Sequence, residues 1–317
     1  MPILNAIRRR LVENQYIYRL AMTLGLAMRA KRECEIAAAR GEKLIFKWST
    51  VYWEKGDEII LFPPMRFALV DYYLTHMRAF HPRVVFKSTG GKKLADLRRP
   101  CQYRLPSGGL VWLPIPAEPL DFFTGYFAKG GPKTGQIVLD GGAYCGETTI
   151  EMATRVGPTG HVFAFEPDVK NLFWLHKNVK ESGLKNITIV PKGLWGETTT
   201  LKFLSDETPG STLVGSNDSA PEHGSVTRID VLSPADAFAL IGRVPDFIKM
   251  DIEGAEVEVV DAMAPLLRAG HVSLAIASYH IRDGRKTHEL ISDVLCRAGL
   301  QVETGYDEHL TTWAWRD

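Results

Sequence analysis

Four titratable residues stand at or just after the ends of short apolar runs, where side chains can do chemistry. They are Asp140, Glu166, Asp251 and His280. If the runs are parallel strands of one sheet, their carboxyl ends share one rim, and these side chains lie near one another. Carboxylates accept hydrogen bonds from hydroxyl groups, and an imidazole exchanges its proton near neutral pH. The set is therefore suited to binding a hydroxylated ligand and to moving a proton.

The stretch 137–149, IVLDGGAYCGETT, joins an apolar run to a glycine turn and then to helical spacing. Such a turn lets the backbone approach a ligand closely and presents free N–H groups at the start of the helix. A dinucleotide site uses the pattern G-x-G-x-x-G, which Gly141, Gly142 and Gly146 do not follow. Asp140, before the turn, would repel a pyrophosphate. It favours a cationic group, such as the amino acid end of S-adenosylmethionine.

Glu166 follows the second apolar run of this region, 161–165. A carboxylate at that strand end can accept hydrogen bonds from both hydroxyl groups of a ribose. The alternative is an ordinary carboxylate at a helix N-terminus, stabilised by the helix dipole. That alternative suits Asp168 better than Glu166.

From residue 137 onward, strand-like and helix-like segments alternate. The expected strands are 137–139, 161–165, 186–190, 199–204, 225–229, 246–250, 272–278, 300–306 and 309–315. One expected helix begins at residue 147, and four more cover 168–182, 233–241, 255–269 and 285–298. Such alternation predicts an α/β fold with a mostly parallel sheet and right-handed crossovers. The last two strands form a hairpin that adds an antiparallel strand at the sheet edge.

Residues 1–125 are interpreted as an N-terminal α+β extension, and residues 126–317 as the catalytic domain. The extension is predicted to contain helices over 3–40 and 67–80, strands over 43–53 and 58–62, and a hairpin over 100–116. Basic and apolar side chains mix along 3–40. This arm can bind an anionic membrane or a partner, or it can pack on the body or on a second copy of the chain. We favour packing.

Composition limits the classes of protein that fit. The 317 residues are 45% hydrophobic and 24% charged, with a formal net charge of +1. This balance gives no argument for a nucleic-acid partner. The four cysteines, Cys34, Cys101, Cys145 and Cys296, are far apart, which suits a reducing compartment. No targeting segment is evident, so we expect a cytoplasmic protein.

Three stretches give the chain from Ile137 to Asp317 a specific resemblance. They are VLDGGAYCGETT, FAFEPD and FIKMDIEGAEVEVV. Together they resemble the FkbM family of class I S-adenosylmethionine-dependent methyltransferases, which have a Rossmann-like sheet. Two residues depart from that family. Tyr144 stands where the family usually has asparagine, and Ser278 stands where it often has a glutamate just before a histidine.

The resemblance implies which residues contact the cofactor. They are Asp140, Gly142, Ala143, Tyr144, Gly146, Glu147, Glu166, Pro167, Lys192, Gly193 and Asp251. It places Asp140 and Glu147 near the methionine end of S-adenosylmethionine, Glu166 at the ribose, and Lys192-Gly193 by the adenine. The resemblance also places Asp251 where the methyl group is transferred, and it implies S-adenosylhomocysteine as the product.

Methyl transfer requires positioning of the acceptor and removal of its proton, for which Asp251 and His280 are the candidate catalytic residues. No metal ligand is assigned, although a divalent metal held by Asp251 with another carboxylate or His280 stays an alternative. The polar loop 205–225 and the aromatic segment 121–127 favour a hydroxylated acceptor. We therefore expect O-methylation of a sugar or natural product.

The expected partner is a small-molecule or glycan acceptor, with neither nucleic acid nor membrane, and a homo-oligomer can form through the N-terminal arm. Two other functions remain open from the sequence. One is a nucleotide-dependent oxidoreductase, and the other is a non-catalytic binding module that uses the basic arm.

Overall fold

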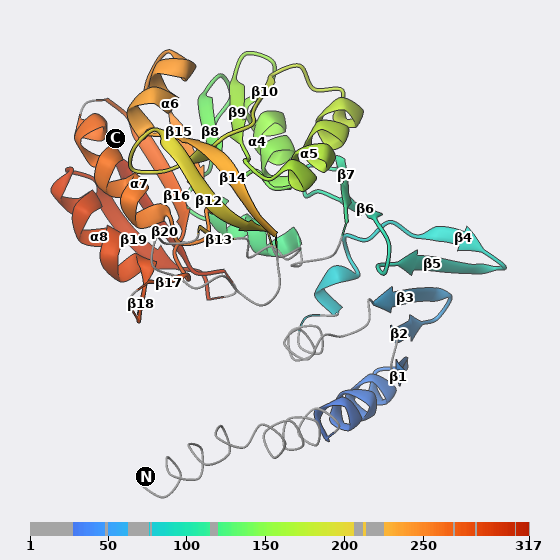
Figure 1. Ribbon diagram of the computed structural model, residues 1–317. Helices are drawn as coiled ribbons and strands as arrows, with labels where there is room; N and C mark the ends of the chain where they lie inside the picture. Colours follow the sequence, from blue (N-terminus) through green and yellow to red (C-terminus); the bar gives the residue numbers. More distant parts are fainter. Residues whose placement is uncertain are drawn as a thin grey trace, which may run out of the picture. The chain divides into compact units, whose positions relative to one another are not determined.

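The computed structural model describes residues 28–47, 50–62, 76, 78–114, 120–205, 212–213, 225–268, 270–282, 284–307 and 309–316 (Figure 1). The chain divides into two compact units, Met1–Cys101 with Pro114–Pro116, and Gln102–Leu113 with Ala117–Asp317. Residues 102–113 and 117–125, which the sequence groups with the extension, thus belong to the second unit. One reason is that Trp112 donates its backbone N–H to Oδ1 of Asn178 at 2.7 Å.

The first unit contains a helix over 28–39 and a five-stranded sheet. Its strands lie in the order β1-β2-β3-β5-β4. They are β1 (Glu42–Lys47), β2 (Thr50–Lys55), β3 (Glu58–Phe62), β4 (Lys87–Thr89) and β5 (Lys92–Asp96).

The single strand predicted over 43–53 is wrong, because β1 and β2 are separate antiparallel strands. No glycine or proline marks the reversal between them, so the sequence pattern gave no turn signal. Residues 1–27 of the predicted arm lie outside the described part. Of the helix predicted over 67–80, only 76 and 78–80 are described, and they are helical.

The second unit is built on a seven-stranded sheet in the order β10-β9-β8-β15-β16-β20-β19 (Figure 1). Its strands are β8 (Ile137–Gly141), β9 (His161–Phe165), β10 (Ile187–Val190), β15 (Phe247–Met250), β16 (Val272–Ala277), β19 (Gln301–Gly305) and β20 (Thr311–Arg316). The predicted mixed α/β sheet is confirmed, and β10, β9, β8, β15 and β16 pair in parallel. The antiparallel strand β20 pairs with both β16 and β19, so it lies one place in from the edge.

Helices cover both faces of this sheet. They are α4 (Glu147–Val156), α5 (Val169–Ser182), α6 (Pro234–Ile241), α7 (Glu256–Met263) and α8 (Thr287–Arg297). One core joins α6, α7 and α8 to the sheet, and a second contains Met152 and Val156 of α4. The helix predicted over 255–269 continues beyond α7 as the 3₁₀ helix η2 (Ala264–Arg268), because Pro265 lacks the N–H that an α-helix needs.

Smaller elements flank the sheet. The predicted hairpin is confirmed as β6 (Cys101–Arg104) and β7 (Leu110–Leu113), and the aromatic segment forms the 3₁₀ helix η1 (Leu120–Phe127). A second sheet has the order β11-β14-β12-β13. Its strands are β11 (Gly193–Leu194), β12 (Thr199–Ser205), β13 (Thr212–Leu213) and β14 (Ser225–Leu232). Most of the predicted loop 205–225 lies outside the described residues.

Two short strands, β17 (Ile281–Arg282) and β18 (Arg285–Lys286), pair with each other ahead of α8. Among the residues that the structure describes, no helix is long and apolar enough to cross a membrane.

Candidate functional site

A cleft opens at the carboxyl ends of β8, β9 and β15, within the second unit. Its volume is about 1000 Å³ when counted to its open mouth. Seven of the residues assigned to the cofactor line it: Gly142, Tyr144, Glu147, Glu166, Pro167, Gly193 and Asp251. Phe123 belongs to the aromatic segment 121–127 that the sequence linked to the acceptor. Sequence reasoning did not assign the remaining lining residues, which are Thr148, Phe165, Asn171, Leu194, Ile229, Val231, Lys249, Ile252, Glu253, Ala255 and Tyr279. Asp140, Ala143, Gly146, Lys192 and His280 lie outside this lining.

The glycine turn packs tightly against the loop after β15. Gly142 has a φ of 72°, and a Cβ added there would lie 1.8 Å from the carbonyl oxygen of Asp251. The backbone N–H groups of Gly142 and Ala143 both donate to the carbonyl of Phe165 at 3.0 Å. Only glycine therefore fits at position 142, and the turn is fixed to both neighbouring strands.

Tyr144 adopts a left-handed backbone conformation with a φ of 47°. Among residues with a side chain, asparagine is one of the types that enter this region most readily. This backbone requirement gives a physical reason for the asparagine that the FkbM family usually has here. Burial raises the pKa of the Tyr144 phenol well above its usual value, so the ring stays neutral beside the cleft.

Asp140 is fully buried beneath the turn and does not line the cleft. Its Oδ2 accepts hydrogen bonds from the hydroxyl groups of Thr148 at 3.0 Å and Thr149 at 2.6 Å. Its Oδ1 lies 3.2 Å from Nζ of Lys249, whose side chain is 3% exposed. The charge that the sequence argument directed at a ligand is therefore paired inside the protein.

Lys249 also fixes the turn that shapes the cleft. Its Nζ donates to the carbonyl oxygens of Gly142 at 2.8 Å and Gly141 at 3.3 Å. A lysine in the middle of the apolar strand FIKM was the available signal, because such a residue is rarely buried without a partner.

Glu166 lies at the end of β9, with both carboxylate oxygens turned toward backbone donors. Oε2 accepts from the N–H of Tyr144 at 2.8 Å, and Oε1 accepts from the N–H of Asp168 at 2.9 Å. Oε1 also accepts from the side-chain amide of Asn171 at 3.3 Å, so Oε2 is the oxygen that keeps acceptor capacity for a further donor, such as a ribose hydroxyl. Burial raises the pKa of Glu166 to about 7, despite these hydrogen bonds. Asp168, by contrast, caps helix α5 through the N–H groups of Lys170 and Asn171, as the helix-terminus interpretation expects.

Glu147 is the second buried carboxyl group of the cleft, at the first residue of α4. Burial raises its pKa to about 8. Apolar side chains of Leu194, Ile229 and Val231 line another wall of the cleft. Gly193 is buried among them, whereas Lys192 is half-buried and does not reach the lining. An apolar wall beside a carboxylate with acceptor capacity suits an adenosine.

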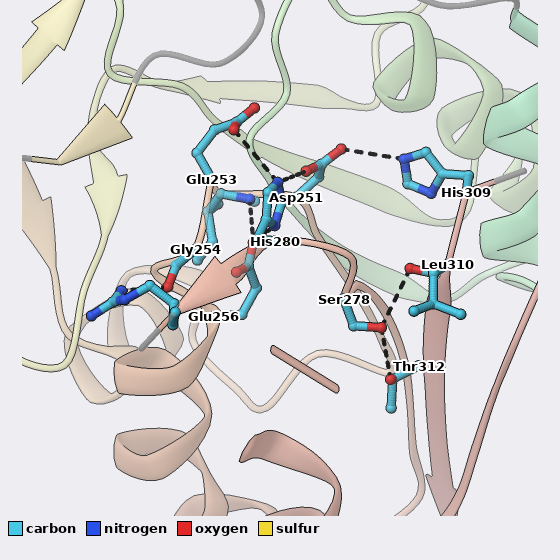
Figure 2. A network of polar contacts seen from close by, with 12 residues as sticks. Asp251, Glu253, Gly254, Glu256, Ser278, His280, His309, Leu310 and Thr312 are labelled. Atoms are coloured by element: carbon cyan, nitrogen blue, oxygen red, sulfur yellow. Dashed lines mark hydrogen bonds and ion pairs between the residues drawn. The ribbon is translucent and has the colours of Figure 1, made fainter. Parts of the chain in front are cut away.

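A network of carboxylates and histidines adjoins the other end of the cleft, and Asp251 and Glu253 of this network line it (Figure 2). Tyr126 donates its hydroxyl to Oδ2 of Asp251 at 2.8 Å, and Nε2 of His309 lies 3.7 Å from the same oxygen. Burial alone would raise the pKa of Asp251, but the neighbouring imidazoles of His309 and His280 hold it well below its usual value. Asp251 is therefore ionised at neutral pH.

His280 lies next to Asp251, with Nε2 3.6 Å from Oδ1, and its side chain is 11% exposed. Desolvation would lower its pKa, but Glu253 and Glu256 raise the pKa of the imidazole to about 11. In the ligand-free site the ring is thus an imidazolium, which has no lone pair to accept a proton. The structure brings the two predicted catalytic residues together. The assignment of either one as the base stays a prediction.

Ser278, which departs from the family pattern, does not line the cleft. It is buried, and its hydroxyl lies 2.9 Å from that of Thr312 and donates to the carbonyl of Leu310 at 3.3 Å (Figure 2). The Ser278 side chain thus links the end of β16 to Thr312 of β20 and to Leu310, which precedes that strand. No carboxylate from position 278 enters the site.

The family model described as the methyltransferase FkbM domain matches residues 140–302, which is more than half of the chain. The chain belongs to this family. The matched range of the FkbM domain contains the glycine turn, Glu166, Asp251, Glu253, Glu256 and His280, whereas Tyr126 and His309 lie outside it. The cofactor of this family is S-adenosylmethionine. The cleft fits that group, because it combines the close-packed turn, a carboxylate with acceptor capacity and an apolar wall.

Solved structures with a similar fold include a methyltransferase FkbM from Methylobacillus flagellatus KT, at 19% identity and a TM-score of 0.46 over 79% of this chain and 53% of that one. This chain therefore spans about half of the length of that protein. Fibrillarin from Aeropyrum pernix, in complex with natively bound S-adenosyl-L-methionine, is 14% identical with a TM-score of 0.40, over 73% and 98% of the two chains. A precorrin-6y C5,15-methyltransferase from Geobacter metallireducens GS-15 is 18% identical with a TM-score of 0.38, over 63% and 90%. No curated protein matches this chain significantly.

Proposed function

We propose that this FkbM domain transfers a methyl group from S-adenosylmethionine to a hydroxyl oxygen of a small polyhydroxylated acceptor, such as a sugar or a sugar-bearing natural product. The observation that carries the proposal is the position of Asp251. Its carbonyl oxygen packs against Gly142 of the cofactor turn, and the same residue lines the end of the cleft near Glu253 and Tyr279. One residue thus joins the cofactor end of the cleft to an end suited to hydroxyl groups.

The chemistry needs little more than alignment. When bound, S-adenosylmethionine supplies a methyl group on a sulfonium, and a neutral thioether leaves as the new oxygen–carbon bond forms. The ionised Asp251 accepts a hydrogen bond from the acceptor hydroxyl and directs an oxygen lone pair toward the methyl carbon. Tyr126 donates its hydroxyl to Oδ2 of Asp251, which fixes the direction of the carboxylate. As the new bond forms, the hydroxyl proton passes to the Asp251 carboxylate, and solvent in the open cleft then takes it up.

The composition of the acceptor end favours a sugar-like molecule. Glu253 and Asp251 offer carboxylate oxygens that accept hydrogen bonds from vicinal hydroxyl groups. Phe123 and Tyr279 add aromatic surface at the cleft, against which a flat apolar face of a ring can pack. A polyhydroxylated ring satisfies both kinds of surface at once.

The test measures the product of the full chain with S-adenosylmethionine and a panel of sugars, glycosides and matched amines. Mass spectrometry and NMR identify the methylated atom. We expect O-methyl products, and Asp251→Asn is expected to lower kcat by about 10²–10⁴-fold while S-adenosylhomocysteine still binds. Exposed Asp261 of α7 provides the control variant Asp261→Asn, which keeps wild-type rates. Methylation of nitrogen or carbon would contradict the proposal, as would a chain that does not bind S-adenosylhomocysteine.

The oxidoreductase that the sequence left open is not favoured, because the family match is to a methyltransferase domain. We propose no nucleic-acid or membrane partner. Self-association through residues 3–40 and a cytoplasmic location stay predictions, since 1–27 lie outside the described part of the chain.

A further inference from the structure

Three potential metal ligands converge beside the cleft. They are Asp251, Glu253 and His280, and one ligand atom from each lies within 4.8 Å of the other two. Nε2 of His280 is 3.6 Å from Oδ1 of Asp251 and 3.5 Å from Oε2 of Glu253 (Figure 2). These separations are too long for hydrogen bonds. Oδ1 of Asp251 and Nε2 of His280 are buried, and neither has a hydrogen-bond partner among the described residues.

A buried carboxylate sets the direction of the imidazole ring. Nδ1 of His280 lies 3.2 Å from Oε1 of Glu256, a residue of α7 that is 0% exposed. The same Oε1 accepts the backbone N–H of Ile252 at 2.9 Å, which holds the carboxylate in place. Metal-binding histidines commonly present their second ring nitrogen to such a carboxylate. Nε2 is thereby turned toward Asp251 and Glu253.

The two carboxylates are also held from outside the cluster. Tyr126 occupies Oδ2 of Asp251, which leaves Oδ1 directed at His280. Glu253 has a φ of 57° and is followed by Gly254 with a φ of 93°. Arg282 fixes this reversal by donating to the carbonyl of Gly254 at 2.6 Å. The Glu253 side chain consequently points back toward His280 (Figure 2).

We propose that Asp251, Glu253 and His280 bind a divalent first-row transition cation such as Mn²⁺ or Zn²⁺. Ligands at about 2.0–2.2 Å from one ion stand roughly 3.0–3.6 Å apart, and the two nitrogen–oxygen separations agree with that spacing. Two carboxylates with one imidazole suit Mn²⁺ and Zn²⁺ better than Ca²⁺ or Mg²⁺, which prefer oxygen ligands. The sequence interpretation assigned no metal ligand, but it kept a metal held by Asp251 with another carboxylate or His280 as an alternative.

Three protein ligands leave coordination positions open, and Asp251 and Glu253 both line the cleft. A cation there would bind the acceptor hydroxyl, lower its pKa and release its proton to solvent as the methyl group is transferred. This role rests on the proposed function, whereas cation binding itself does not. The alternative occupant of the cluster is the proton of an imidazolium held between carboxylates.

The experiment titrates Mn²⁺ into the EDTA-treated full chain, with free Mn²⁺ followed by electron paramagnetic resonance and heat by calorimetry. We expect one Mn²⁺ per chain, displaced by Zn²⁺. Glu253→Gln and His280→Asn each remove one metal ligand, and Glu256→Gln removes the carboxylate that orients the His280 ring. All three variants should therefore bind Mn²⁺ more weakly by about 10–100-fold or more. Asp261→Asn, which removes an exposed carboxylate from the same helix as Glu256, is the matched control and keeps wild-type affinity.

Binding of S-adenosylhomocysteine and thermal unfolding are measured on every variant. If His280→Asn fails to fold, Glu253→Gln decides, because that side chain is 27% exposed and its amide replacement keeps its shape. The site is rejected if a chain that binds S-adenosylhomocysteine takes up no Mn²⁺ or Zn²⁺, or if Glu253→Gln binds Mn²⁺ as tightly as the wild type. Mn²⁺ binding without S-adenosylhomocysteine binding would instead uphold the site and reject the proposed function.

Discussion

Lys249 and Asp140 form a buried ion pair under the cofactor turn, with Nζ 3.2 Å from Oδ1 and side chains that are 3% and 0% exposed. The pair connects β15 to β8, which are adjacent parallel strands. Lys249 also donates to the carbonyl oxygen of Gly142. The ion pair therefore links the stability of the sheet to the shape of the cleft.

Removing the cation should destabilise the domain strongly. Lys249→Met keeps the length of the side chain but leaves Asp140 buried without an opposite charge, which typically costs about 3–5 kcal/mol. The free energy of unfolding from denaturant titration measures this loss. Asp140→Asn/Lys249→Met removes both charges, and it should be more stable than Lys249→Met alone. Equal stability of the single and double variants would mean that the pair is not coupled.

Gly142→Ala should destabilise the protein and weaken S-adenosylhomocysteine binding, because its Cβ would meet the carbonyl of Asp251. Gly183→Ala is a matched control, since Gly183 has the same φ of 72° with no atom within 4 Å of an added Cβ. The control isolates backbone strain of about 1–2 kcal/mol. The loss of stability in Gly142→Ala should exceed the loss in Gly183→Ala by about 1–3 kcal/mol. Similar losses for both variants would show that the turn moves freely away from Asp251.

Tyr144 tests whether the left-handed backbone governs the choice of residue in the turn. Tyr144→Asn and Tyr144→Val both remove the ring, but a β-branched side chain is strongly disfavoured at a φ of 47°. We expect the Val variant to be less stable than the Asn variant by about 1–2 kcal/mol, in thermal or denaturant unfolding. The Asn variant should keep S-adenosylhomocysteine binding. An equally stable Val variant would contradict the backbone explanation.

Glu166 should make cofactor binding depend on pH. Its pKa is raised from 4.5 to about 7 by burial, and ribose hydroxyl groups hydrogen-bond better to the ionised form. S-adenosylhomocysteine affinity should therefore rise by about tenfold between about pH 6 and pH 8. Calorimetric titrations across this range measure it. Glu166→Gln should bind S-adenosylhomocysteine more weakly, and its affinity should no longer change with pH around 7. Any change in affinity that remains near pH 8 would come from Glu147.

The same shift predicts the stability of the ligand-free protein with the opposite sign. The unfolded chain releases the Glu166 proton near pH 4.5, whereas the folded chain keeps it until about 7. The folded state thus binds more protons in this window, so its free energy of unfolding falls as the pH rises and then levels off. The difference between the wild type and Glu166→Gln should follow this course. A difference that is constant with pH would show that Glu166 ionises normally.

The alternation of apolar runs with helical segments was enough to predict the sheet and its helices, because side-chain period and turn residues report local structure. β8, β9, β15 and β16 lie where the runs predicted them. The hairpin of β1 and β2 was missed, since its reversal has no glycine or proline. Whether β20 lies at the edge or beside it depends on pairing between distant segments, which local pattern does not specify.

The sequence by itself determined the fold class, the glycine turn and the carboxylates on one rim of the sheet, because strand direction and turn chemistry are local properties. Only the tertiary structure decided what each charge faces. It paired Asp140 with Lys249 rather than with a ligand, kept the acceptor capacity of Glu166 in the cleft, and turned His280 toward Asp251 and Glu253. These outcomes depend on burial and on distances between residues remote in sequence, and such distances fix the partner and the pKa of each group.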